Sequence, residues 1–241
     1  MEVKVLSIDE INREVAGRII NLVNSNKNAI LGLATGSTPV GVYKTLVKAY
    51  EDKKVSFKTI RSFNLDEYIG LQETNDQSYR YFMNTNLFDH IDIDKKNTRV
   101  PCGLGDVEKN AKDYDIAIDN AGGIDFQILG IGSDGHIAFN EPGTPFDEGT
   151  HIAKLTEMTI KDNSRFFEKI EDVPTTAITM GLKSIMKAKE IVLIATGLNK
   201  ANAVKELVEG KMSEDWPCTI LQKHPNVTIY VDKDAYSKVS K

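Results

Sequence analysis

The stretch from Leu129 to Gly143 concentrates side chains that could carry out chemistry. It places Asp134, His136 and Glu141 within eight positions, after an apolar run and a glycine-rich turn. A carboxylate beside an imidazole orients the ring and stabilises its protonated form. Such a group can donate and accept protons near neutral pH, so the pattern indicates a proton-transfer catalyst.

The same three side chains could instead hold a metal ion. No second histidine stands at a ligand spacing, because His90, His151 and His224 are scattered along the chain. A serine nucleophile is also disfavoured, since no Gly-x-Ser-x-Gly turn is present. A capped loop with a structural histidine is the remaining alternative, and we expect no metal.

Two adjacent carboxylates, Asp66 and Glu67, follow a second apolar run, Ile60–Leu65. The carboxyl end of a parallel strand is where open α/β sheets bind ligands. Because side chains alternate along a strand, we expect only one of the two to point into a crevice. The alternative is a solvated acidic turn.

A loop of small and hydroxyl residues, Thr35, Gly36, Ser37 and Thr38, lies between an apolar run and Pro39. Backbone N–H groups at the start of a helix bind anions, and the hydroxyls add donors, so a phosphate is the expected guest. Neither Gly-Lys-Ser/Thr nor Gly-x-Gly-x-x-Gly is present, which disfavours a nucleotide. An ordinary helix cap and tight turn is the alternative.

Two basic residues could add charge to such an anion site. Arg165 stands in a polar stretch, and Lys200 follows an apolar run at the start of an amphipathic segment. Arginine grips a phosphate through two nitrogens, whereas lysine supplies a point charge. Either residue alone would more commonly be a solvated surface group.

Short apolar runs alternate with longer amphipathic segments along the chain. The runs, expected to be strands, are Ala29–Ala34, Ile60–Leu65, Phe126–Ile131, Ile191–Thr196 and Val227–Val231, and the expected helices are Ile8–Ser25, Pro39–Tyr50, Gln77–Phe88, Val107–Asn120 and Asn199–Glu209. This alternation predicts one α/β domain over residues 1–241, with a mostly parallel, doubly wound (Rossmann-like) sheet flanked by helices. The polar stretch from about 143 to 175 shows no clear strand, and we expect it to be a mobile lid.

Composition narrows the possible partners. The 241 residues are 41% hydrophobic and 27% charged, which is typical of a globular protein. The formal charge of −5, without a Lys/Arg cluster, argues against nucleic acid. The two distant cysteines, Cys102 and Cys218, favour a reduced cytoplasmic compartment. We expect neither a signal peptide nor a membrane span, because the start carries charges and the longest uncharged run is too short and polar.

Taken together, the motifs resemble those of the glucosamine-6-phosphate deaminase family over nearly the whole chain. They are GLATGSTP at 32–39, FNLDEY at 63–68, DGHIAFNEPG at 134–143, NSRFF at 163–167 and ITMG at 178–181. The related 6-phosphogluconolactonases share an Asp-Gly-His element, but they typically carry Asp-Glu-Arg where this chain has Asp-Glu-Tyr. A sugar-phosphate hydrolase of that kind is the alternative function.

The resemblance implies conversion of glucosamine 6-phosphate and water to fructose 6-phosphate and ammonia, a step of amino-sugar catabolism. It makes Asp66 the base that moves a proton between C2 and C1, and it makes His136 the group that opens the sugar ring. Asp134 and Glu141 would hold and tune His136. It assigns phosphate binding to Thr35, Gly36, Ser37, Thr38, Arg165 and Lys200, and it implies no metal or organic cofactor.

The chain departs from the allosteric members of that family. Those enzymes are activated by N-acetylglucosamine 6-phosphate and carry an arginine and a lysine where this chain has His151 and Ala153. We therefore expect no such activation. The resemblance leaves open whether the protein is a monomer or a homo-oligomer.

Overall fold

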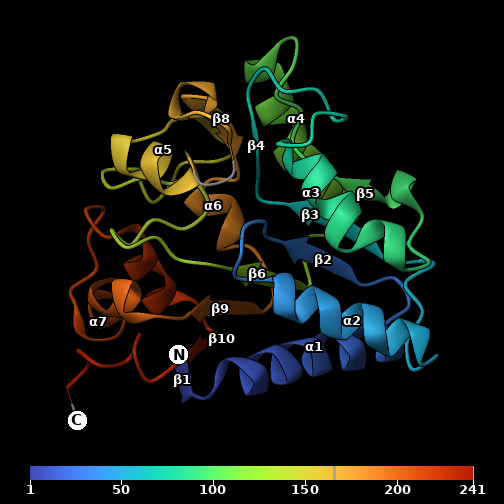
Figure 1. The fold of residues 1–241 in the computed structure, drawn as a ribbon, viewed down its shortest axis with the longest axis horizontal. Coiled ribbons are helices and arrows are strands. Elements are labelled where there is room, and N and C mark those ends of the chain that lie inside the picture. Colours follow the sequence, from blue (N-terminus) through green and yellow to red (C-terminus); the bar gives the residue numbers. More distant parts are fainter. Residues whose placement is uncertain (165–166, 241) are drawn as a thin grey trace.

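A seven-stranded parallel sheet forms the centre of the molecule (Figure 1), in the order β1-β10-β9-β6-β2-β3-β5. The computed structural model describes residues 1–164 and 167–240. The strands are β1 (Glu2–Val5), β2 (Ile30–Leu33), β3 (Arg61–Asn64), β5 (Thr98–Arg99), β6 (Phe126–Leu129), β9 (Ile191–Ala195) and β10 (Val227–Val231). Every neighbouring pair in this sheet is parallel, which confirms the predicted mostly parallel architecture.

Four of the five inner strands are mostly apolar, because helices cover both faces of the sheet. Strands β2, β6, β9 and β10 are buried along their whole length, as expected for a sheet shielded from water on both sides. The five predicted strands are all present. The two edge strands β1 and β5 were not predicted, because they are short and partly exposed.

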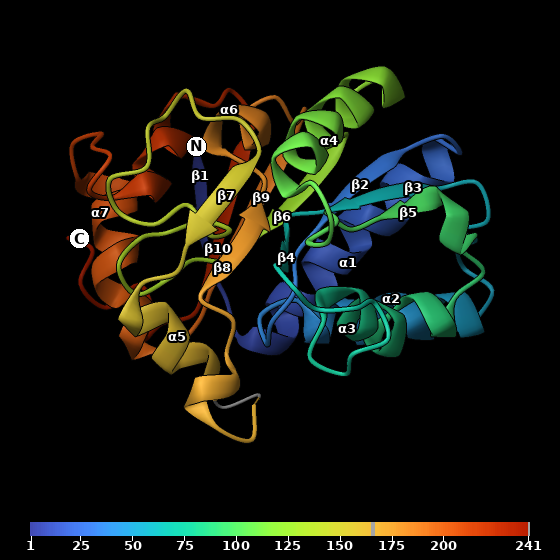
Figure 2. The same cartoon turned by 90° about the horizontal axis from the view of Figure 1, so that it is seen from above.

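Seven α-helices are assigned within the described residues. They are α1 (Ile8–Ser25), α2 (Val40–Glu51), α3 (Tyr79–Asn86), α4 (Val107–Ala121), α5 (Glu157–Asn163), α6 (Leu182–Ile185) and α7 (Ala201–Glu209), with 3₁₀ turns at η1 (Phe88–His90), η2 (Lys95–Asn97), η4 (Ile170–Asp172), η5 (Leu198–Lys200) and η6 (Pro217–Lys223). Helix α1 begins with a capping box between Ser7 and Glu10. Figures 1 and 2 show α1 and α2 on one face of the sheet and α4 on the other.

A second, antiparallel sheet lies above the carboxyl side of the first (Figure 2). Its order is β4-β8-β7, formed by β4 (Asp66–Tyr68), β8 (Thr176–Thr179) and β7 (His151–Lys154). The expectation that residues 143 to 175 lack a strand is therefore wrong. Strand β7 escaped detection because it is a four-residue edge strand with mostly polar or exposed positions.

The order of the strands creates a place for a ligand. From β2 the chain crosses to β3 on one side, whereas from β6 it crosses to β9 on the other. Strands β2 and β6 are neighbours, so the connections diverge between them, and such a switch point opens a crevice at the carboxyl ends. Within the described part of the chain, no helix is long and apolar enough to cross a membrane.

Candidate functional site

A cavity of about 870 Å³ opens at this switch point. Its volume lies within the usual range for small-molecule sites. Seven of the side chains predicted from the sequence line it, namely Thr35, Gly36, Ser37, Thr38, Asp66, His136 and Lys200. The cavity is lined from the ends of β2, β3, β6 and β9, which are neighbours in the sheet, by residues 34–38, 65–66, 130–132, 194–196 and 199–200. The predicted phosphate ligand Arg165 lies outside the described residues.

Asp66 reaches the cavity because the chain changes sheets at Leu65. The N–H of Leu65 donates to Leu33 in the large sheet, and its carbonyl accepts the N–H of Met180 beside the small one. Asp66 then begins β4 opposite Thr179. The residue is 6% exposed, and burial, helped by the neighbouring Glu67 charge, raises the pKa of Asp66 to about 8. A carboxyl group that titrates near neutrality can serve as a general base.

Glu67 has a structural role, as the alternation of side chains predicts. It is buried, and its carboxylate accepts N–H bonds of 2.9 to 3.0 Å from Tyr68, Tyr79 and Arg80. Burial raises the pKa of Glu67, and these three hydrogen bonds oppose that effect. Glu67 therefore ties the start of α3 to the strand that carries Asp66.

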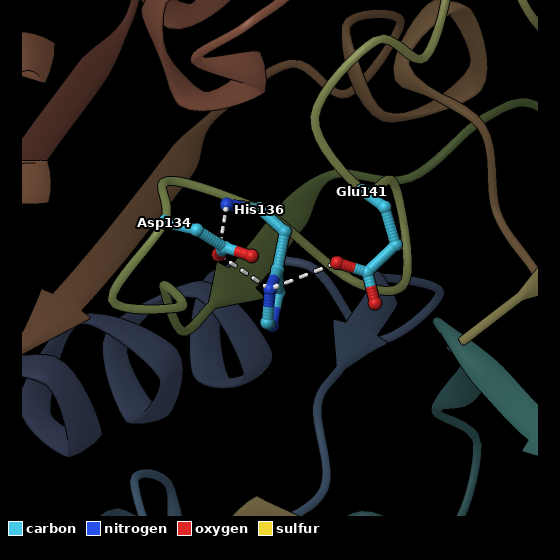
Figure 3. A group of neighbouring side chains, drawn as sticks. All are labelled: Asp134, His136 and Glu141. Carbon is cyan, nitrogen blue, oxygen red and sulfur yellow. Dashed lines mark hydrogen bonds and ion pairs between the residues drawn. The ribbon is translucent and has the colours of Figure 1, made fainter. Parts of the chain in front are cut away.

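His136 stands between two carboxylates (Figure 3). Its Nδ1 lies 2.8 Å from Asp134 Oδ1 and 3.6 Å from Glu141 Oε2. Burial raises the pKa of Asp134, but the hydrogen bond and charge of His136 lower it by more than burial raises it. The pKa of Asp134 therefore lies below its usual value. Because an ionised carboxylate stabilises a protonated imidazole, this arrangement can support His136 through a proton transfer.

The turn that carries these groups is tightly constrained. A β-carbon on Gly132 would overlap both the His136 ring and the Asp134 carboxylate. Ala138, which lines the cavity, has a positive φ of 54°, a conformation that costs a side-chain-bearing residue about 1 to 2 kcal/mol. The buried Asn140 amide holds the turn by donating to the carbonyls of Ile137 and Met180, both at 2.9 Å.

The loop of residues 35–38 and Lys200 border the same cavity, one before the start of α2 and the other before the start of α7. Gly36 takes a φ of 83°, which lets the loop turn before α2 begins at Val40. Lys200 ends the 3₁₀ turn before α7. This turn is fixed by Asp232, whose two carboxylate oxygens accept the N–H of Gly197 at 3.0 and 2.9 Å.

An aromatic wall was missed in the sequence. Tyr68, Tyr79, Phe139 and Phe167 all line the cavity, and the ring centroids of Tyr68 and Tyr79 are 4.8 Å apart. Tyr68 also contacts Phe139 at 6.0 Å and Phe167 at 5.8 Å. These residues come from four separate segments, so no spacing in the sequence reveals them.

The charged cluster is also compact enough to hold a cation. The ligand atoms of Asp134, His136 and Glu141 all lie within 4.8 Å of one another. An imidazole nitrogen that already faces a carboxylate at 2.8 Å equally fits acid–base chemistry, which needs no ion.

Comparison with known proteins defines the class to which this fold and site belong. The family model described as glucosamine-6-phosphate isomerases/6-phosphogluconolactonase matches residues 4–230. The chain therefore belongs to this family, as the sequence motifs predicted.

Relatives of about 50% identity carry the name of only one of the two activities in that description. The chain is 50% identical to a glucosamine-6-phosphate deaminase of Clostridium novyi (strain NT), over 98% of this chain and all of the relative. It is 52% identical to a protein of the same name from Mycoplasma mycoides subsp. mycoides SC, over the whole of this chain and 98% of the relative. A solved monomeric glucosamine-6-phosphate deaminase superimposes with a TM-score of 0.97 at 40% identity, over 99% of this chain and 100% of that one.

A 6-phosphogluconolactonase from Thermotoga maritima has a TM-score of 0.76 at 20% identity, over 96% of this chain and 99% of that one. This likeness shows a shared fold only.

Proposed function

We propose that this protein is an enzyme that converts glucosamine 6-phosphate and water to fructose 6-phosphate and ammonia. The observation that carries the proposal is a single cavity that joins a buried carboxyl group, Asp66, to an imidazole flanked by carboxylates and to an anion loop. The relatives of about 50% identity, which bear the name of this activity, support the same conclusion.

The phosphate anchors the substrate away from the bonds that change. In the proposed arrangement it binds to the backbone and hydroxyls of residues 35–38, with Lys200 and Arg165 supplying positive charge. Binding energy from this remote group orients the sugar and its reacting carbons.

His136 then opens the sugar ring by moving a proton between the anomeric hydroxyl and the ring oxygen, with Asp134 and Glu141 stabilising its charged form. Asp66 takes the proton from C2 of the open aldehyde while the carbonyl oxygen O1 is protonated, which gives an enolamine. Asp66 then returns its proton to C1 as the nitrogen lone pair forms the C=N bond at C2, and the proton that the nitrogen loses balances the one that O1 gained. Water adds to this imine, and ammonia departs from the resulting carbinolamine. The carbonyl of the substrate accepts the electrons and its amine donates them, so the scheme uses no cofactor and no metal.

We place the enzyme in the cytoplasm, where both cysteines would stay reduced. Cys102 and Cys218 are both free thiols, one exposed and the other buried, which supports this compartment.

The direct test is to incubate the purified protein with glucosamine 6-phosphate and to measure ammonia and ketose phosphate together. We expect both products in equal amounts. The Asp66→Asn variant should lose turnover by about 10²- to 10⁴-fold while it still binds substrate. Hydrolysis of 6-phosphogluconolactone without ammonia release from the amino sugar would instead favour the lactonase alternative.

A further inference from the structure

Helix α5 contacts the catalytic turn through one buried hydroxyl. Thr159, which is 3% exposed, donates from Oγ1 to Glu141 Oε1 over 2.6 Å. The N–H of Thr156, which caps the helix, approaches the same oxygen at 3.4 Å. Thr159 also lines the cavity, together with Lys161 and Asn163 from the same helix.

The two oxygens of Glu141 have different surroundings. Oε1 receives the donors of α5, whereas Oε2 is buried, carries no hydrogen bond to any described residue and lies 3.6 Å from His136 Nδ1. A carboxylate is planar and rigid, so a donor that fixes Oε1 also fixes the direction of Oε2. Asp134 and His136 lie close to Glu141 on the same turn, while α5 contributes the neutral donors described above.

We propose that Thr159 is a positioning residue, whose hydroxyl holds Glu141 so that its second oxygen faces His136 during ring opening. Without this donor the carboxylate could rotate about its side-chain bonds, and Oε1 would be a buried charged oxygen without its strongest partner. Such an oxygen costs free energy unless the group turns to find another donor. Turning would remove Oε2 from the imidazole.

The same helix also reaches the other half of the site. Burial dominates the pKa of Tyr68 and raises it to about 12, while hydrogen bonds, including one with the Asn163 side chain, oppose this rise. Tyr68 lies on the strand of Asp66. Helix α5 therefore contacts both the segment that carries the base and the turn that carries the imidazole.

Three substitutions of Thr159 distinguish the effect of its hydroxyl from the effect of its side-chain shape. Thr159→Val keeps the volume and branching, Thr159→Ala removes both, and Thr159→Ser keeps the hydroxyl. Thr59→Val is the matched control. Thr59 precedes β3 and donates to the carbonyl of Lys27, which precedes β2, so this hydrogen bond lies at the amino ends of the strands, away from the cavity. For each protein we would measure kcat and KM, and the affinity for the sugar alcohol obtained by reducing C1 of the open substrate.

If the hydroxyl positions Glu141, the Val and Ala variants should both lose about tenfold in kcat, while KM and the affinity for the alcohol change less than about twofold. The Ser variant should recover most of the turnover, and the Thr59 control should match the wild type. In a Glu141→Gln background, Thr159→Val should lower kcat by less than about twofold further, because the partner is already altered.

Other outcomes would overturn the inference. These are a Val variant as active as the wild type, a Ser variant as impaired as Ala, or a loss that appears only in KM. Should one variant fail to fold, the other hydroxyl-free variant decides, with melting temperature as the check.

The inference rests on the proposed function, but the two fail differently. A wild-type protein that releases no ammonia would reject the function, whereas an active wild type with equally active variants would reject only the role of Thr159.

Discussion

The state of one buried carboxyl group, Asp66, decides how the site responds to pH. Its pKa of about 8 in the folded protein lies well above the value of about 3.9 for an exposed aspartate. The charged form is therefore disfavoured in the cavity, chiefly because of burial. This makes the group a better proton acceptor once it is ionised. It also lowers the free energy of unfolding at high pH, where the buried carboxylate is charged.

The first prediction concerns turnover. Because Asp66 must be ionised to take the C2 proton, kcat/KM should rise with pH and level off above about pH 8. A pH profile of kcat/KM at constant ionic strength checks this. A flat profile between about pH 6 and pH 9, after correction for the titration of the substrate's own phosphate and amine, would contradict the role of Asp66 as the base.

The second prediction concerns stability. A folded-state pKa above the unfolded one gives a contribution that is complete below about pH 4 and is lost as the pH rises through about 8. Asp66→Asn removes this loss, so its melting temperature should exceed that of the wild type by an amount that grows from pH 5 to pH 9, reaching several degrees. Thermal melts of both proteins across this range test the sign. A difference that does not change with pH would exclude the linkage.

The third prediction concerns Gly132, which leaves room for the His136 ring and the Asp134 carboxylate. A methyl group there would displace the His136 ring and the Asp134 carboxylate, so Gly132→Ala should lower kcat by about 10²-fold with unchanged circular dichroism. Gly17→Ala is the control, since nothing lies near its added β-carbon in α1. Equal activity of the two variants would show that the ring position is not critical.

At the scale of elements, the loops that follow neighbouring strands border one cavity. The fourth prediction is that Lys200→Ala raises KM for glucosamine 6-phosphate by about 10- to 100-fold, as expected for loss of a charge-assisted contact. Lys205 lies on α7, shortly after Lys200 in the chain, and pairs with Glu209, so Lys205→Ala should leave KM unchanged. A similar loss of activity toward glucosamine without phosphate would argue against direct phosphate contact.

The strands that carry the site were predictable because their burial on both faces leaves a continuous apolar signal. Helix α1 was placed correctly at both ends from its regular apolar stripe. Strand β7 was not found, because an edge strand covered on only one side alternates too briefly to stand out. Its antiparallel sheet is assembled from three separated segments, and such pairing leaves no local trace.

In the site, too, residues in local motifs were predictable from the sequence, whereas contacts between separate segments were not. Asp66, Asp134, His136 and Glu141 were named from the sequence because they stand in two dense motifs. The order of the two carboxylates around His136, 2.8 Å against 3.6 Å, required coordinates. The contact of Thr159 with Glu141 joins residues 18 positions apart across a loop and a strand, so neither spacing nor composition could indicate it.

At the scale of the whole molecule, we expect no allosteric activation, because the chain lacks the arginine and the lysine of the effector site of its allosteric relatives. His151 and Ala153 both lie on β7, where Ala153 is buried and His151 bonds to the Gly149 carbonyl. The fifth prediction is hyperbolic saturation by substrate, with the same curve when N-acetylglucosamine 6-phosphate is added. A sigmoidal curve that the effector relaxes would refute it.

The pairing of β1 with β10 joins the earliest strand of the chain to the latest. During synthesis β1 must therefore remain without this partner until the much later β10 has left the ribosome. Contacts between such distant residues form slowly, because a long loop must close first. Docking of this last pair should be among the final events of folding, well after the strands around the cavity have assembled.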